Sequence, residues 1–257
     1  MPQAHSRRLE SELEPGSARL RIPHVRAGLN RAQQAHLAAF YLSIEAERCR
    51  ESMAKRMLDV ALGALLMAAF LPLVTLIAIA IKATSRGPVL FRQRRLGVQG
   101  RPFVMYKFST MRNGASQEPH RTFVSRMVDG PGDGAHCDGV YKLRNDDRVT
   151  PIGRLLRRSS LDELPQLLNV LRGEMSIVGP RPALDYEVEL YQPWQFERLA
   201  VRPGITGRWQ VFGRNRLTYY QMCQRDVEYV RTWSLRQDLL IMARTPWVML
   251  MNSGGAS

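Results

Sequence analysis

Lysine, cysteine and histidine are scarce in this chain of 257 residues, and each scarcity argues against a class of site. The three cysteines are widely spaced and form no CxxC pair, which indicates neither a disulfide framework nor a zinc site and favours a reducing compartment. The five histidines form no HExxH or His-x-His cluster, so we expect no histidine-bound metal. Only four of the 37 basic residues are lysines, and the others are arginines.

Glycine-rich nucleotide loops are absent as well. The sequence has no GxxxxGK[ST] loop, no GxGxxG after a strand and no GxSxG elbow. The formal net charge of +14 nevertheless calls for an anionic partner, either nucleic acid, a membrane surface or a phosphorylated substrate. Arginine presents a planar fork of donors that suits phosphate, although genome composition explains an arginine excess equally well. No aromatic-studded basic patch, helix-turn-helix spacing or zinc motif favours nucleic acid.

One apolar run dominates the organisation, since residues 60–81 contain no charged side chain over 22 positions. A helix of this length is about 33 Å long and matches a hydrocarbon core of roughly 30 Å. The run lies too deep in the chain for a signal peptide, and no small-residue cleavage site follows it. We therefore predict a membrane helix over residues 55–82, with a buried core helix as the alternative.

Two details argue against a simple span. Pro72 lies at the thirteenth of the 22 positions, where an interior proline removes one helical hydrogen bond. Lys55 and Arg56 precede the run while Lys82 and Arg86 follow it, so the positive-inside rule selects no orientation. A helix that breaks at Pro72 and returns to the same face would keep both basic flanks at the anionic cytoplasmic leaflet.

The remaining sequence predicts an α+β chain that is mainly helical. Residues 1–28 read as a mobile arm, and residues 29–54 as a helix that leads into the membrane segment. Short β-prone runs on both sides of the turn at 97–100 predict a small β-hairpin, and a loop is expected at 113–139. Amphipathic helices are expected at 151–172 with one break, at 217–232, and at 235–251, where the last either lies in the membrane interface or packs on the core.

A charged cluster carries the strongest chemical signal. Arg154, Arg157 and Arg158 stand at helical spacing, so they can share a face, and they precede the adjacent carboxylates Asp162 and Glu163. Pro165 fits the first turn of a helix that runs to about Leu171, which would place both carboxylates just outside a helix N-terminus that also favours phosphate. A structural alternative is a capping box formed by Ser160 and Glu163, with the arginines on a solvated face.

Rigid turns that carry arginine follow this cluster. Pro180 and Pro182 flank Arg181, so the backbone is restrained on both sides of one guanidinium. Arg202 stands beside Pro203-Gly204, and Arg208 follows Gly207. The phosphate-binding capacity of this chain is therefore predicted to rest on arginines.

The chain resembles the bacterial sugar transferase family, the monotopic polyprenyl-phosphate phosphoglycosyl transferases, over roughly residues 55–245. The matching stretches, in family order, are KRMLD (55–59), GPVLFRQ (87–93), YKFSTM (106–111), SLDELPQLLNVL (160–171), MSIVGPRP (175–182) and RPGITG (202–207). Family members often place serine before the helix-breaking proline, and Leu71 stands there in this chain. The resemblance implies a core form without the four additional N-terminal membrane helices of the larger members.

The resemblance implies a specific reaction. Such enzymes transfer a sugar-1-phosphate from a UDP-sugar to undecaprenyl phosphate and release UMP in a ping-pong reaction. By this analogy Asp162 is the nucleophile that forms an aspartyl-phosphosugar, and Glu163 binds Mg²⁺. Phosphate or nucleotide would be bound by basic and proline residues of the matching segments and their neighbours: Lys107, Arg154, Arg157, Arg158, Pro180, Arg181, Pro182, Arg202 and Arg208.

The implied organisation has three parts: an N-terminal extension over residues 1–54, a re-entrant membrane helix over 55–82 that contains Pro72, and a catalytic domain over 83–257. It would be a monotopic protein with amphipathic interfacial helices at the bacterial inner membrane, its active site facing the cytoplasm. The expected partners are a UDP-sugar, undecaprenyl phosphate and inner-membrane lipid, without nucleic acid, and a homodimer is left open. The competing classes are a membrane-anchored nucleic-acid-binding protein and a non-catalytic scaffold, and the intact Asp162-Glu163 pair argues against the scaffold.

Overall fold

The computed structural model describes residues 52–112, 114, 122, 146–213 and 217–251. The described part is mainly helical, with a two-stranded antiparallel ribbon and a short parallel strand pair. The expected arm at 1–28, the expected helix at 29–54 up to residue 51, and nearly all of the expected loop at 113–139 lie outside the described residues.

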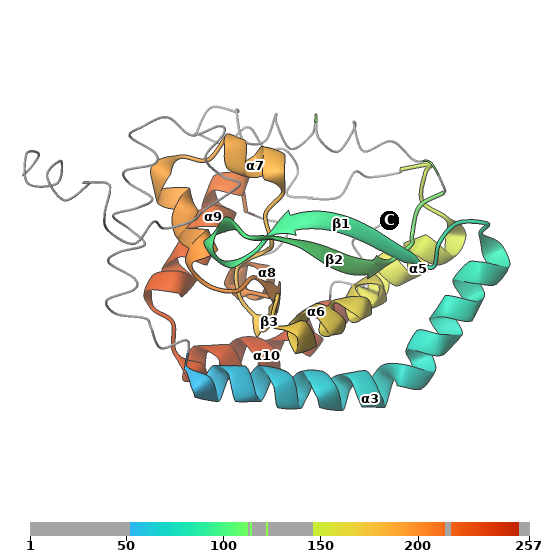
Figure 1. Ribbon diagram of the computed structural model, residues 1–257, viewed down its shortest axis with the longest axis horizontal. Coiled ribbons are helices and arrows are strands. Elements are labelled where there is room, and N and C mark those ends of the chain that lie inside the picture. Colours follow the sequence, from blue (N-terminus) through green and yellow to red (C-terminus); the bar gives the residue numbers. More distant parts are fainter. Residues whose placement is uncertain (1–51, 113, 115–121, 123–145, 214–216, 252–257) are drawn as a thin grey trace, which may run out of the picture.

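The long helix α3 (Met53–Thr84) runs along one edge of the molecule (Figure 1) and extends the predicted membrane helix by two residues at each end. Among the described residues it is the one helix long and apolar enough to cross a membrane, and only 11% of its most apolar window is buried. That exposure disfavours the alternative of a soluble core helix. The helix is continuous through Pro72 and bends along its course, as Figure 1 shows, whereas its return to the same membrane face stays a prediction.

The predicted β-hairpin is confirmed. Strand β1 (Leu90–Leu96) pairs antiparallel with β2 (Pro102–Phe108), with Leu90 opposite Phe108 and Leu96 opposite Pro102. The short 3-10 helix η1 (Val98–Gly100) closes the ribbon at the predicted turn, where Gln99 and Gly100 both take left-handed φ values of 55° and 69°. Leu96, Met105 and Phe108 enter three different hydrophobic clusters, so the ribbon joins the parts of the core.

The helical stretch predicted at 151–172 is also confirmed, together with its break. Helix α5 (Pro151–Ser159) ends at the left-handed Ser160, the 3-10 helix η2 (Leu161–Gln166) follows, and α6 (Leu167–Arg172) completes the run. Pro165 lies in η2, just before α6, and not in the first turn of α6 as its sequence position had suggested. The helix α6 therefore begins two residues after Pro165, and the proline lies near the end of the preceding 3-10 turn.

A parallel pair of short strands, β3 (Ser176–Val178) and β4 (Gly204–Thr206), forms the centre of the remaining fold. Around it lie five helical elements: α7 (Asp185–Glu189), η3 (Pro193–Ala200), α8 (Arg208–Phe212), α9 (Tyr219–Arg231) and α10 (Leu235–Met251). The last two confirm the helices predicted at 217–232 and 235–251. Helix α10 packs on the core through Ile241 and leaves Leu239, Leu240 and Trp247 more than half exposed, so it has both a core face and an outward apolar face.

Candidate active site

The two adjacent carboxylates lie on η2 and face different surroundings. The Asp162 residue is only 6% exposed, whereas the Glu163 side chain is partly exposed. The left-handed Ser160 (φ 57°) sets the direction in which η2 leaves α5, and its carbonyl accepts a hydrogen bond from the Glu163 amide at 3.2 Å. The Ser160 side chain makes no capping hydrogen bond, so the capping-box alternative is wrong. A simple helix cap therefore does not explain the carboxylate pair.

Two basic side chains approach the carboxylates from neighbouring elements. Lys107 on β2 places its Nζ 2.8 Å from Oε1 of Glu163. Arg157 on α5 donates from Nε to Oγ1 of Thr110 at 3.0 Å. Burial lowers the pKa of the Arg157 guanidinium, and the charge of Asp162 opposes that change, which places Asp162 within electrostatic reach. The fold thus gathers the dyad, Lys107 and Arg157 at one place.

The three arginines of α5 do not all share one face. Arg154 and Arg158, one turn apart, are exposed, whereas Arg157 turns partly inward toward Thr110. Leu155 is 65% exposed between them. The sequence spacing had suggested one common face, but the contact of Arg157 with Thr110 separates it from the other two.

The Pro-Arg-Pro turn is held from two sides. The carbonyl of Pro180 accepts from the Gly204 amide at 2.8 Å, and the carbonyl of Pro182 accepts from the buried Arg95 at 2.9 Å. A Cβ on Gly179 would lie 2.4 Å from the carbonyl oxygen of Arg202, so the backbone segments of the GPRP and RPG motifs cross too closely for any side chain there. These contacts fix the turn that carries Arg181.

Two further predicted phosphate ligands are engaged elsewhere in the fold. Arg202 donates from Nε to the carbonyl of Gly173 at 2.8 Å, at the C-terminal end of α6. Arg208 pairs with Glu228 of α9 at 2.7 Å. Figure 1 shows α8, which carries Arg208, and α5 in separate parts of the molecule. Substrate binding by these two arginines stays a prediction.

The basic residues before the apolar run contact the folded domain. Lys55 donates to Asp238 at 2.7 Å and to the carbonyl of Val178 at 3.0 Å. Arg56 donates to the carbonyls of Val170 and Leu171 at 2.7 and 3.0 Å, and so covers the end of α6. Sequence reasoning had assigned both residues to the lipid surface alone. Their position in the KRMLD motif was the only signal of a structural role.

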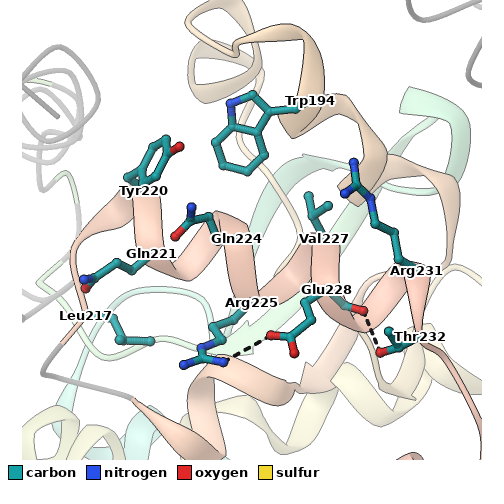
Figure 2. A pocket seen from close by; sticks show the side chains of 10 residues that line it. All are labelled: Trp194, Leu217, Tyr220, Gln221, Gln224, Arg225, Val227, Glu228, Arg231 and Thr232. Atoms are coloured by element: carbon teal, nitrogen blue, oxygen red, sulfur yellow. Dashed lines mark hydrogen bonds and ion pairs between the residues drawn. The ribbon is translucent and has the colours of Figure 1, made fainter.

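A separate groove of about 670 Å³ lies on the outer side of α9. Figure 2 shows Trp194 and Tyr220 on one side of it and the ion pair of Arg225 with Glu228 on the other. None of its lining residues belongs to the predicted site. The groove is therefore distinct from the carboxylate pair.

Oxygen ligands for a cation are limited to few groups. Among the described residues, no group of three or more His, Cys, Asp and Glu side chains could hold a metal ion. The candidate oxygen ligands at the site are the adjacent carboxylates of Asp162 and Glu163, of which the Glu163 side chain is partly exposed. This set fits Mg²⁺, which is commonly held by one or two carboxylates together with substrate phosphates and water.

The long, exposed and apolar helix α3 is compatible with a membrane-associated protein. The chain belongs to the bacterial sugar transferase family, whose sequence pattern matches residues 50–252.

Several relatives share most of this region. The exopolysaccharide production protein ExoY of Rhizobium meliloti is 41% identical over 202 residues, which is 79% of this chain and 88% of that protein. The UDP-glucose:undecaprenyl-phosphate glucose-1-phosphate transferase of Caulobacter vibrioides is 46% identical over 206 residues, 77% of this chain and 70% of that protein. The undecaprenyl-phosphate galactose phosphotransferase of Salmonella typhimurium is 39% identical over 168 residues, 65% of this chain and 34% of that protein.

Proposed function

We propose that this enzyme transfers a sugar-1-phosphate from a UDP-sugar to undecaprenyl phosphate and releases UMP. The transfer would initiate assembly of an exopolysaccharide, capsule, O-antigen or glycoprotein glycan. The observation that carries the proposal is the buried Asp162 within electrostatic reach of Arg157, together with the Glu163–Lys107 pair, in a chain with relatives named for this transfer to undecaprenyl phosphate.

Asp162 is the proposed nucleophile. A carboxylate oxygen attacks the phosphorus that bears the sugar, an aspartyl oxygen–phosphorus bond forms, and the phosphoanhydride bond to UMP breaks. The phosphate oxygen of undecaprenyl phosphate then attacks the same phosphorus and releases Asp162 as a carboxylate. This ping-pong order suits the site because two anionic substrates visit one carboxylate in turn and need not be held together.

Positive charge around the dyad supports the proposal. Arg157, held by Thr110, and Lys107, paired with Glu163, can neutralise phosphate charge that develops during transfer. Glu163 would hold Mg²⁺ when the donor is bound, and the ion would supply Lewis-acid neutralisation of the diphosphate. Arg181, on its restrained turn, would contact the nucleotide.

The exposed apolar surface of the chain supports a lipid acceptor. The apolar side chains of α3 are mostly exposed, and the exposed Leu155 lies between the exposed arginines Arg154 and Arg158 of α5. An apolar residue between two cations suits the interface of an anionic leaflet. In this proposal the active site faces the cytoplasm at the inner membrane, where UDP-sugars are soluble.

Release of UMP tests the function. The purified protein is incubated with undecaprenyl phosphate, Mg²⁺ and, in turn, UDP-glucose, UDP-galactose and N-acetylated UDP-sugars. We expect one or a few donors to give continuous UMP release that depends on the acceptor. The proposal fails if no UDP-sugar releases UMP, or if Asp162→Asn retains the full rate.

A further inference from the structure

A buried ion pair joins η3 to α9 directly behind the Pro-Arg-Pro turn. Nη2 of Arg198 lies 2.8 Å from Oδ2 of Asp226, and the side chains are 4% and 1% exposed. Taking two charges out of water costs several kcal/mol per ion, and a well-packed apolar pair often stabilises a fold as well or better. A buried pair is therefore weak evidence for stability, and its surroundings indicate what else it does.

Arg198 reaches toward the backbone of the arginine turn. Its Nη2 also donates to the carbonyl oxygen of Arg181 at 3.5 Å. Its Nη1 donates to the hydroxyl of Tyr191 at 2.5 Å and to Sγ of Cys223 at 3.4 Å, so the guanidinium is fixed on three sides.

Asp226 is linked to the same turn through its ion pair with Arg198. Burial raises the pKa of Asp226 to about 6, and Arg198 first, then the backbone and the charge of Arg181, oppose that rise. The Arg198 guanidinium links this carboxylate to the main chain of Arg181, because its Nη2 lies 2.8 Å from Oδ2 of Asp226 and 3.5 Å from the carbonyl oxygen of Arg181. Flanking prolines already restrain the backbone on both sides of this residue. The hydrogen bond from Arg198 to the carbonyl oxygen of Arg181 would restrict the remaining rotation of this main chain.

We propose that Arg198 and Asp226 are positioning residues, which hold the Arg181 main chain so that its guanidinium points at the donor nucleotide. This inference rests on the proposed nucleotide contact of Arg181. Neither residue need touch the substrate, because both act through Arg181. The pair therefore determines affinity for the nucleotide and not the chemistry at Asp162.

The first test measures binding of UDP to the full-length protein in lipid nanodiscs, together with steady-state kinetics. Asp226→Asn should weaken UDP binding and raise the donor KM by about tenfold, because small misplacements of a binding group are costly. The kcat and the KM for undecaprenyl phosphate should change less than about twofold.

The matched control is Glu197→Gln. Like Asp226, Glu197 is a buried carboxylate. It lies on η3 and pairs with Arg231 of α9 at 2.6 Å. It joins the same two elements, but its pairing is with Arg231 and not with the turn. This variant should lower thermal stability while leaving UDP affinity unchanged. Equal losses of UDP affinity in both variants would overturn the proposal, because they would indicate a general loosening of η3 against α9.

A double-mutant cycle separates the two proposals. If Asp226 acts through Arg181, UDP should bind to the Arg181→Ala, Asp226→Asn double variant as it binds to Arg181→Ala alone. Additive losses would overturn the positioning role, whereas unchanged UDP affinity in Arg181→Ala would refute the nucleotide contact of Arg181 itself.

Tyr191→Phe, which removes one hydrogen bond to Arg198 at nearly constant volume, provides the measurement if Asp226→Asn does not fold. It should weaken UDP binding about threefold, and unchanged binding would contradict the proposal.

Discussion

At the scale of single residues, the neighbouring carboxylates Asp162 and Glu163 differ in burial and in the cation that each faces. Asp162 is buried near Arg157, and Glu163 is partly exposed and paired with Lys107. A buried carboxylate beside a cation is protected from water, and a partly exposed one is accessible to a hydrated cation such as Mg²⁺. The two adjacent positions can therefore serve as nucleophile and cation ligand without competing for the same ligand.

Lys107 offers a direct test of this division. Lys107→Met keeps most of the side-chain length but removes the charge that lies 2.8 Å from Glu163. We expect kcat/KM for the donor to fall about 10²-fold, because the site loses a fixed positive charge. The control is Lys82→Met, at an exposed position in the last turn of α3, which should stay within about twofold. Equal activity of the two variants would contradict a role for Lys107 in the site.

Asp226 predicts a pH dependence of stability. Burial raises the pKa of this carboxyl from 3.8 to about 6, so between these values the native state holds a proton that the unfolded chain has lost. The contribution of Asp226 to stability is therefore complete below pH 4 and is lost as the pH rises through 6, a change of about 3 kcal/mol. The free energy of unfolding of the wild type, measured relative to Asp226→Asn, should fall between pH 4 and 6. A flat or rising difference would contradict the raised pKa.

At the scale of elements, the bend of α3 has two local causes. Pro72 lacks the amide that would bond the carbonyl four residues earlier. Thr75 donates its hydroxyl to the carbonyl of Leu71 at 2.9 Å, a back-bond that also favours bending. Leu71 stands directly before the proline, and the hydroxyl of Thr75 bonds the carbonyl of Leu71.

Re-entry of α3 is tested by cysteine labelling. With single cysteines at Ala54 and Ser85 in a cysteine-free background, both positions should react from the same side of the membrane. Pro72→Ala restores a hydrogen bond worth part of the roughly 3 kcal/mol cost of an interior proline and should shift part of the population to a straight span. Labelling of the wild type on opposite sides would refute re-entry.

At the scale of the whole molecule, a buried network attaches α3 to the catalytic domain. Asp238 of α10 accepts from Lys55 at 2.7 Å, from the Tyr229 hydroxyl at 2.7 Å and from the Trp233 indole at 3.0 Å. Asp59 of α3 accepts from the Ser176 hydroxyl and the Ile177 amide at 3.0 and 2.9 Å. The charged residues at the start of α3 thus set where this apolar helix lies relative to β3 and α10.

The network predicts a large difference in stability between two ion pairs. Asp238→Ala should lower the free energy of unfolding by about 3–5 kcal/mol, because it leaves the Lys55 ammonium buried without its counter-ion. Arg94→Ala removes an ion pair whose side chains are 59% and 47% exposed, and should cost less than about 1 kcal/mol. Thermal unfolding in the same detergent compares the two, and similar losses would contradict the attachment role.

The sequence predicted those features that depend on local pattern. The turn at 97–100 between β-prone runs located the hairpin, and the amphipathic pattern at 151–172 predicted the helical run from α5 to α6 with one break. Long-range polar contacts were missed, because Lys55 and Asp238 are 183 positions apart and nothing in their spacing indicates a pair. For the same reason, the inward turn of Arg157 toward Thr110 could not be distinguished from a shared arginine face.

The central claim is that Asp162 becomes covalently bonded to the phosphosugar. The direct measurement is the intact mass of the protein after mixing with the active UDP-sugar and Mg²⁺ in the absence of undecaprenyl phosphate. The account predicts up to one UMP released per enzyme and a mass gain of one phosphosugar, located on the peptide that contains Asp162 and discharged when the acceptor is added. An unmodified protein that still turns over, or the same mass gain in Asp162→Asn, would contradict it.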